Sequence, residues 1–293
     1  MAIPRRHHLV LALLSVLFTG PVRADWTFGV ADFSTSEPLK NAPAIIAAGY
    51  DYIEPGLAKA VALPEGDFRA AADGLRAAGI RVRAMNWFVP GTVKLTGPDA
   101  NPAAARAYAE RALALAHGLG AQAIVFGSPG ARTVPENFPH DRAWAQLVEF
   151  CRICADIISR ENYPIRIGIE HLNRGETNIV NSLADAIRLA REVNRPQIGV
   201  TIDFYHLVVE KEDVDMVLRA KDLVAHVQLA DPDGRKFPRP GADIPGLPRF
   251  FENLRAIGYE GPISIEANVS DLGADLAAGL AALRAVAAKC PRR

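Results

Sequence analysis

The chain has 293 residues, with 33 Lys and Arg against 33 Asp and Glu, so its formal net charge is zero. A neutral chain without a basic run lacks the positive surface that binding to a phosphate backbone requires, so we expect no nucleic-acid partner. Hydrophobic residues make up 49% of the chain and charged residues 23%, which excludes a disordered protein and is enough for a large core. One globular domain, or two small ones, is expected for this length.

Residues 1–24 have the composition of a secretory signal peptide. A basic start at residues 5–8 precedes an almost unbroken apolar run at 9–18, and residues 22–24 form a small-x-small cleavage site. An uncleaved anchor is the alternative, but the apolar run is about half the roughly 20 residues that span a bilayer. We therefore expect an exported, periplasmic protein whose mature domain is 25–293, with no stable membrane span after cleavage. Arg5 and Arg6 leave the twin-arginine export route open.

Short β-branched runs alternate with Ala- and Leu-rich segments of helical spacing along the rest of the chain. The predicted strands lie at 26–30, 50–54, 81–85, 122–126, 165–170, 197–203, 223–229 and 262–266, and the clearest helices at 101–118, 141–160, 182–193 and 272–289. This alternation predicts a single (β/α)8 TIM barrel of the α/β class. A doubly wound open sheet is the competing fold, because alternation alone does not show closure. No Gly-rich phosphate fingerprint follows the first strand, which argues against a dinucleotide-binding form of that sheet.

The three cysteines indicate no redox or metal pair. Cys151 and Cys154 lie within a predicted helix and lack the strand-to-helix entry that redox motifs use. We interpret them as two buried thiols on one helix face, and Cys290 has no evident partner in the sequence.

The last four predicted strands each carry an inward oxygen donor near their end. In 165–170 the isoleucines take alternate positions, so a period of two places Glu170 on the opposite face, toward the barrel interior. The same test on the next three strands places Asp203, Gln228 and Glu266 inward. The donors are one strand–helix unit apart, so they should converge at the C-terminal mouth, where such barrels carry their active sites.

A divalent metal would explain this convergence. Three carboxylates in a mostly apolar wall repel one another and lose hydration unless a cation neutralises them. We therefore predict a metal site formed by Glu170, Asp203, Gln228 and Glu266. Hard oxygen donors without a thiolate favour Mn²⁺, Mg²⁺ or Co²⁺ over a structural zinc. The alternative is that the acids form separate salt bridges with Arg166, Arg174 and Arg235.

Further polar residues follow these strand ends. Glu176 lies six residues after Glu170, His206 three after Asp203, and Arg235 seven after the donor of the seventh strand. With these motifs the chain resembles the xylose isomerase-like family of sugar isomerases and epimerases, especially ketose 3-epimerases and hydroxypyruvate isomerase, over essentially all of 25–293. The resemblance implies the same four metal ligands, with Mn²⁺ as the first choice, and it implies substrate contacts from Glu176, His206 and Arg235.

The resemblance also implies a reaction. A metal that chelates a carbonyl and the adjacent hydroxyl acidifies the neighbouring C–H and stabilises a cis-enediolate, while two carboxylates act as base and acid. These carboxylates correspond to Glu170 and Glu266. The result is a metal-dependent sugar isomerase or epimerase for a ketose or keto-sugar. Ketose 3-epimerases carry His where this chain has Gln228, and hydroxypyruvate isomerase carries Gln, so the motifs indicate the family and not the substrate.

Other functions in the same fold are the alternatives. A keto-sugar lyase or dehydratase, of the inosose dehydratase or 3-keto-glycoside-cleaving type, would use the same metal site. A phosphate hydrolase resembling endonuclease IV would need many histidines, and only five of the seven follow residue 24. A sugar-binding barrel without catalysis is expected to lack one of the two glutamates, and both are present. The expected partner is a small-molecule sugar, and a homo-oligomer is left open.

Aromatic residues follow the third predicted strand at the same end of the barrel. Trp87 and Phe88 could stack on a sugar face, or they could pack in the core or in a lid. Ser128, after the fourth strand, could bind substrate or serve only a tight turn. The sequence favours neither reading for these residues.

Overall fold

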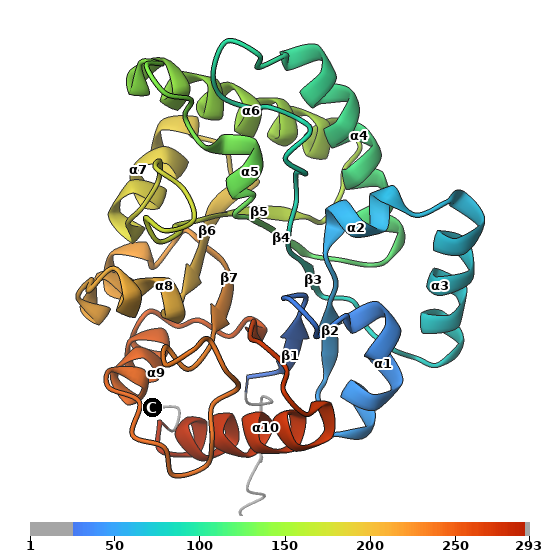
Figure 1. The fold of residues 1–293 in the computed structure, drawn as a ribbon, viewed down its shortest axis with the longest axis vertical. Helices are drawn as coiled ribbons and strands as arrows, with labels where there is room; N and C mark the ends of the chain where they lie inside the picture. The colour runs from blue at the N-terminus through green and yellow to red at the C-terminus, as the bar shows by residue number, and fades with distance from the viewer. Residues whose placement is uncertain (1–25, 291–293) are drawn as a thin grey trace, which may run out of the picture.

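The structure is a computed structural model that describes residues 26–290. Eight parallel strands form the wall of a barrel in the order β2-β1-β8-β7-β6-β5-β4-β3 (Figure 1). They are β1 (Phe28–Ala31), β2 (Tyr52–Glu54), β3 (Ala84–Met85), β4 (Ala123–Phe126), β5 (Arg166–Glu170), β6 (Ile198–Asp203), β7 (Val224–Leu229) and β8 (Ile263–Ile265). Isolated parallel bridges, Ile53 to Val82 and Gly56 to Asn86, join β2 to β3. The predicted barrel is confirmed and the open sheet is wrong.

Helices surround this wall, as Figure 1 shows. They are α1 (Pro38–Ala47), α2 (Leu57–Ala62), α3 (Glu65–Ala77), α4 (Pro102–Gly118), α5 (Pro129–Arg132), α6 (His140–Arg160), α7 (Leu183–Val193), α8 (Phe204–Val209), α9 (Leu247–Ala256), α10 (Leu272–Ala288) and the 3₁₀ helix η1 (Val214–Ala220). Side-chain caps begin several of them, because Asn101, Ser182 and Asp271 accept the otherwise unpaired N–H groups of α4, α7 and α10. No helix within residues 26–290 is long and apolar enough to cross a membrane.

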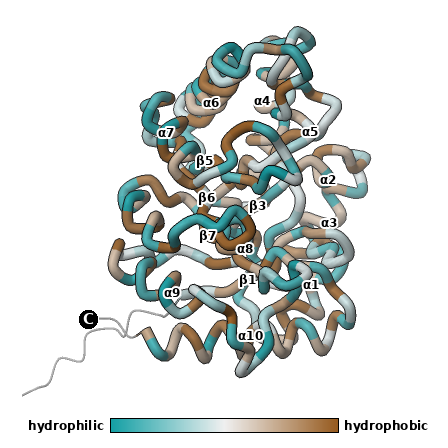
Figure 2. The backbone as a smooth tube through the Cα atoms, turned by 60° about the vertical axis from the view of Figure 1, so that its left-hand side comes forward, coloured by the Kyte–Doolittle hydropathy of each residue, from teal (hydrophilic) through white to brown (hydrophobic). Residues whose placement is uncertain are grey.

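The hydrophobic core lies on both sides of the strands. Every residue of β1, β2, β4, β6 and β8 is buried, because the outer face packs on helices and the inner face fills the barrel. Along outer helices such as α6, hydrophobic and hydrophilic residues alternate (Figure 2). The buried residues of α6 include Cys151 and Cys154, which are free thiols as expected, and Cys290 is also free and buried.

The barrel interior depends on one close approach between strands. Thr201 of β6 donates its hydroxyl to the carbonyl oxygen of Gly168 in β5 at 3.2 Å. A Cβ at Gly168 would overlap the Thr201 side chain, so glycine is required for these strands to fill the interior in this way.

All eight strands are shorter than predicted, and β3 differs most. β2 begins at Tyr52 and β3 has two residues, although the predictions were 50–54 and 81–85. Residues 81–83 still serve the sheet, because the carbonyl oxygen of Arg81 accepts the N–H of Ile53 and that of Arg83 accepts the N–H of Gln122. The shortening leaves the carboxyl ends of the strands, and therefore the mouth, in place.

Candidate active site

Four oxygen donors stand at the carboxyl ends of adjacent strands. Glu170 and Asp203 are the last residues of β5 and β6, Gln228 is the penultimate residue of β7, and Glu266 follows β8 directly. Their exposed fractions are between 0% and 7%, so all four side chains are buried. Gln228 Nε2 lies 3.5 Å from Glu266 Oε1. Glu170, Asp203 and His206 each bring a ligand atom within 4.8 Å of the others.

Three oxygen atoms of these four side chains are buried and have no hydrogen-bond partner in the described part of the chain. They are Glu170 Oε1, Asp203 Oδ2 and Gln228 Oε1. A buried oxygen without a partner costs free energy, so such atoms point to a missing positive partner. Two carboxylate oxygens and one amide oxygen are hard donors, and this set fits a divalent cation that prefers oxygen.

Burial shapes the electrostatics of the cluster. It raises the pKa of Glu170 well above its ordinary value, and the nearby Glu266 and Asp203 carboxylates raise it further. Burial also raises the pKa of Asp203 to about 7, against the opposing effect of Arg235. The pKa of Glu266 is raised by burial as well, again opposed by Arg235. The cluster therefore favours either bound protons or a bound cation.

His206, from α8, faces the two carboxylates at the ends of β5 and β6. Its Nε2 lies 3.6 Å from Glu170 Oε1 and 3.6 Å from Asp203 Oδ2. Burial, followed by the charge of Arg235, lowers the pKa of His206 well below its ordinary value, so the ring is neutral. Nδ1 accepts the backbone N–H of Asn173 at 3.1 Å. The ring proton is therefore on Nε2, directed toward the carboxylates.

Arg235 reaches the cluster from the loop after β7. Its guanidinium bonds Glu266 Oε2 and, at 3.0 Å, Glu176 Oε1. The rings of Phe33 and Tyr205 lie 3.9 Å and 4.5 Å from its Cζ, so two aromatic faces hold the cation. Its backbone has a φ of 49°, in the left-handed region that non-glycine residues seldom adopt. Such strain is found where a side chain must be aimed at a site.

The alternative prediction was that the acids form separate salt bridges with three arginines, and only one of the three, Arg235, pairs closely with a predicted ligand. Arg235 does pair with Glu266. Arg174 instead pairs with Glu210, and Arg166 donates to the backbone carbonyl oxygens of Leu223 and Val224. Arginine pairing therefore gives Asp203 only a long contact, 3.9 Å from Arg235, and within residues 26–290 the Glu170 carboxylate forms no ion pair with an arginine.

Three residues that support the cluster were missed by the sequence reasoning. Asn86, after β3, donates Nδ2 to Glu266 Oε1 at 2.7 Å and to the carbonyl oxygen of Asp32 at 2.7 Å. Asn173 fixes His206, as described above. Glu54, the last residue of β2, bonds Gln228. Of the three, only Glu54 could have been found from the sequence, because it is the last residue of a predicted strand, as most of the predicted metal ligands are.

Buried Arg132 joins the ends of β4 and β5. It donates to the carbonyl oxygens of Phe126 at 3.0 Å and Glu170 at 2.8 Å. Burial lowers the pKa of Arg132 to about 10. A neighbouring glycine completes the support, because a Cβ at Gly127 would overlap the Glu170 carboxylate.

The two aromatic residues after β3 have different surroundings. Phe88 is fully buried and packs on Phe126 and Phe150, so it belongs to the core. Trp87 is 52% exposed, and Lys59 Nζ lies 5.0 Å from its ring. Ser128 Oγ accepts the N–H of Val89 at 2.9 Å, so this serine holds the loop that follows β3.

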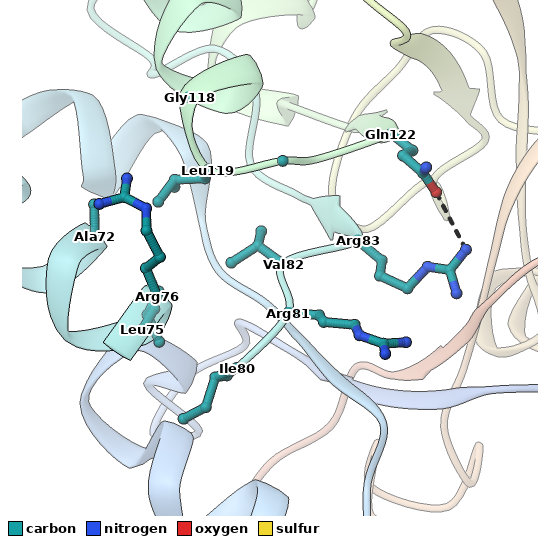
Figure 3. Close-up of a pocket in the computed structure, with 11 residues that line it drawn as sticks. Ala72, Leu75, Arg76, Ile80, Arg81, Val82, Arg83, Gly118, Leu119 and Gln122 are labelled. Atoms are coloured by element: carbon teal, nitrogen blue, oxygen red, sulfur yellow. Dashed lines mark hydrogen bonds between the residues drawn. The ribbon is translucent and has the colours of Figure 1, made fainter. Parts of the chain in front are cut away.

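A hollow of about 460 Å³ lies at the other end of the barrel. Residues 80–83, before β3, and residues 118–120 and Gln122, before β4, line it together with the end of α3 (Figure 3). Its Arg83 bonds Gln122 at 3.2 Å. Because TIM barrels carry their chemistry at the carboxyl ends of the strands, this hollow is not the candidate active site.

Curated relatives with similar sequences are sugar epimerases. The ketose 3-epimerase of Arthrobacter globiformis is 30% identical over 103 residues, 35% of each chain. The 3-dehydro-D-guloside 4-epimerase of Escherichia coli (strain K12) is 28% identical over 138 residues, 47% of this chain and 50% of the relative. The chain thus spans about a third to a half of the length of these curated relatives.

Solved structures share the fold over a longer stretch. The structure of a D-allulose 3-epimerase from Methylomonas sp. has a TM-score of 0.76 at 22% identity and covers 89% of this chain and 98% of that one. The apo 3-keto-D-glucoside 4-epimerase of E. coli has a TM-score of 0.74 at 22% identity, with 89% and 100% covered. The family model of the xylose isomerase-like TIM barrel matches residues 43–286, which is most of the chain. The chain therefore belongs to the xylose isomerase-like TIM barrel family.

Proposed function

We propose that this protein is a divalent-metal-dependent sugar epimerase or isomerase that acts on a ketose or keto-sugar. The observation that carries the proposal is the group of buried oxygens without partners in residues 26–290, Glu170 Oε1, Asp203 Oδ2 and Gln228 Oε1, beside the Glu266 carboxylate. The names of the relatives, a ketose 3-epimerase and a keto-glycoside 4-epimerase, support the substrate class.

Four side chains would hold the metal, namely Glu170, Asp203, Gln228 and Glu266. All four supply oxygen, which favours Mn²⁺, Mg²⁺ or Co²⁺. The resemblance to the sugar epimerases makes Mn²⁺ the first choice among them. When bound, the metal supplies Lewis acidity toward a substrate carbonyl and its neighbouring hydroxyl. His206 is excluded from this ligand set by its tautomer, because the Nε2 that faces the carboxylates carries the proton.

Glu170 and Glu266 would transfer the proton. They stand at the end of β5 and just after β8, with β6 and β7 between them, so their carboxylates approach a substrate from different sides. One takes the proton from the carbon beside the carbonyl, which leaves the cis-enediolate of the sugar. Return of a proton to the other face of that carbon gives an epimer. Return to the neighbouring carbon gives the aldose or ketose isomer.

Three further side chains would bind the sugar. The neutral His206 ring donates from Nε2 to a substrate oxygen, and the Arg235 guanidinium donates to the oxygen on which negative charge develops. Glu176, whose side chain is 31% exposed, accepts a sugar hydroxyl. The Arg235 cation stays charged, because the Glu266, Asp203 and Glu176 carboxylates raise its pKa although burial opposes them.

We also propose that the protein is exported to the periplasm. The support is the basic and then apolar composition of residues 1–24, which lie outside the described residues. Cleavage after Ala24 would leave the domain 25–293. We expect the protein to be released from cells when the outer membrane is permeabilised. A protein that stays inside spheroplasts, protected from added protease, would instead be cytoplasmic.

Deuterium exchange tests the reaction. The purified protein, loaded with Mn²⁺, is incubated in D₂O with a panel of ketoses and 3-keto-glycosides and followed by NMR. We expect deuterium at the carbon beside the carbonyl, a product of unchanged skeleton, and loss of both after chelation of the metal. Release of water or of an aglycone would instead establish a lyase or dehydratase. Exchange that persists in the chelated protein would overturn the metal-dependent mechanism.

A further inference from the structure

A second polar cluster fills the barrel interior beside Gln228. Glu54 Oε2 lies 2.8 Å from His226 Nε2, which is 3.3 Å from Ser264 Oγ, and that hydroxyl lies 2.8 Å from the hydroxyl of Tyr52. These four residues come from β2, β7 and β8, and each is fully buried. A carboxylate so deep in a barrel is costly unless hydrogen bonds satisfy it, and here both of its oxygens are used.

The other Glu54 oxygen holds the amide of Gln228. Gln228 Nε2 donates to Glu54 Oε1 at 2.9 Å. The amide nitrogen therefore faces Glu54, and the amide oxygen faces away from it. That oxygen, Gln228 Oε1, is buried and has no hydrogen-bond partner in the described chain.

Two carboxylates accept from the Gln228 amide nitrogen in this orientation, and Glu54 is the closer of the two. The Glu266 carboxylate lies 3.5 Å from Gln228 Nε2, and Glu170 and Asp203 complete a strongly acidic cluster at the same mouth. An amide N–H is attracted to such a cluster and an amide oxygen is repelled by it. The bond to Glu54 is shorter by 0.6 Å than the contact to Glu266 (2.9 against 3.5 Å), so Glu54 makes the larger contribution to holding the amide nitrogen on this side.

We propose that Glu54 is a positioning residue that holds the Gln228 oxygen toward the metal site and thereby keeps an amide usable as a metal ligand. The proposal rests on the metal site of the proposed function. Glu54 does not touch the substrate. It acts through Gln228, as groups hydrogen-bonded to metal ligands commonly do.

The rival role for Glu54 is purely structural, as the partner of His226. Ser264 separates the two roles, because its hydroxyl also bonds His226 but, among residues 26–290, makes no hydrogen bond to the side chain of Gln228, its register partner on β7. Ser264→Ala is therefore the matched control for damage to the interior cluster. If only the interior packing mattered, Ser264→Ala and changes at Glu54 would affect metal binding alike.

Mn²⁺ affinity is the test, measured from the EPR signal of free Mn²⁺ and by calorimetry, without substrate. Glu54→Met keeps the length of the side chain and removes both acceptors. We expect it to weaken Mn²⁺ binding about 10- to 100-fold. Glu54→Asp keeps a carboxylate but moves it away from Gln228, and we expect Mn²⁺ affinity to fall about 10-fold. This variant tests the proposal if Glu54→Met fails to fold. Ser264→Ala should stay within about 2-fold of the wild type.

A double-mutant cycle shows whether Glu54 acts through Gln228. In a Gln228→Met background, Glu54→Met should cause no further loss of Mn²⁺ affinity. An unchanged affinity in Glu54→Asp, or an equal loss in the Gln228→Met background, would overturn the proposal while the metal site stands. A wild-type protein that binds no Mn²⁺ would overturn both this proposal and the proposed function.

Discussion

The backbone N–H of Asn173 donates to Nδ1 of His206 at 3.1 Å, and the side-chain amide nitrogen of Asn173 lies at the same distance. A ring nitrogen that accepts a backbone N–H carries no proton, so the proton of the neutral ring is on Nε2. His206 lies close enough to Glu170 and Asp203 to complete a group of three metal-binding residues. Its tautomer makes it a donor to substrate instead.

Replacement of His206 by Ala should therefore affect the sugar and spare the metal. We expect kcat/KM to fall about 10-fold or more, because one hydrogen bond to the reacting sugar is lost, while Mn²⁺ affinity stays within about 2-fold. Steady-state kinetics and Mn²⁺ titration measure the two effects. Nitrogen-15 NMR of the wild type should also show an unprotonated Nδ1. A loss of Mn²⁺ affinity as large as the loss of kcat/KM would make His206 a metal ligand.

Glu266→Gln separates the two roles proposed for this residue. The amide oxygen still coordinates a metal but the amide cannot accept a proton from carbon, so turnover should fall by about 10² to 10⁴. Mn²⁺ binding should weaken much less. The measurements are product formation and Mn²⁺ affinity on the same preparation, with circular dichroism as the control for folding. Turnover at the wild-type rate would refute the two-carboxylate mechanism.

The barrel and its main cluster could be predicted because their signals repeat along the chain. In 165–170 and 197–203, isoleucine and valine at alternate positions mark the helix-facing side, and this alone orients Glu170 and Asp203. β2 and β3 have three and two residues, too few to show such a period, so Glu54 and Asn86 were missed.

Other contacts leave no trace in sequence patterns. Asn173 acts on His206 through its backbone N–H, which every residue except proline possesses. The pairing of Arg132 with the carbonyl oxygen of Glu170 depends on the short helix α5, which places Arg132 beside the ends of β4 and β5. Such contacts follow from tertiary structure, and a linear pattern does not encode them.

Trp87 follows β3 at the mouth of the barrel, and its side chain is half exposed. Asn86, the residue before it, bonds Glu266, so the indole is anchored next to a carboxylate proposed to move the proton. Its backbone has a φ of 49°, and Lys59 lies over its ring at 5.0 Å. An exposed indole of this kind can stack on a sugar ring that extends out of the site.

We therefore expect Trp87→Ala to discriminate between one-ring and two-ring substrates. KM for a 3-keto-glycoside with a second ring should rise about 3- to 10-fold, while KM for a free ketose should change by less than about 2-fold. Trp144→Ala on α6 is the matched control, because its ring packs on Arg188 and its Nε1 bonds Glu192, both on α7. Equal effects of Trp87→Ala on both substrates would show that the indole only supports the loop.

Glu212 should make the folded protein less stable as the pH rises. Both of its oxygens accept the N–H of Leu183 at 3.0 Å at the start of α7, and its side chain is 12% exposed. Burial raises the pKa of Glu212 to about 7, with the Leu183 N–H opposing. His171, 3.5 Å away, offers no positive charge, because burial and then Arg132 lower its pKa to about 3.

A carboxyl whose pKa is raised on folding stabilises the fold fully below its unfolded pKa, near 4.3, and that stabilisation is lost as the pH rises through about 7. Glu212→Gln should remove this loss, because the amide stays neutral, keeps an acceptor for Leu183 and can donate to His171 Nδ1. We expect the variant to be about 1 to 3 kcal/mol more stable than the wild type at pH 8 and nearly equal to it at pH 4. Urea unfolding across this pH range measures the difference, with exposed Glu136→Gln as the control. A stability difference between Glu212→Gln and the wild type that did not change with pH would show that folding does not raise the pKa of Glu212.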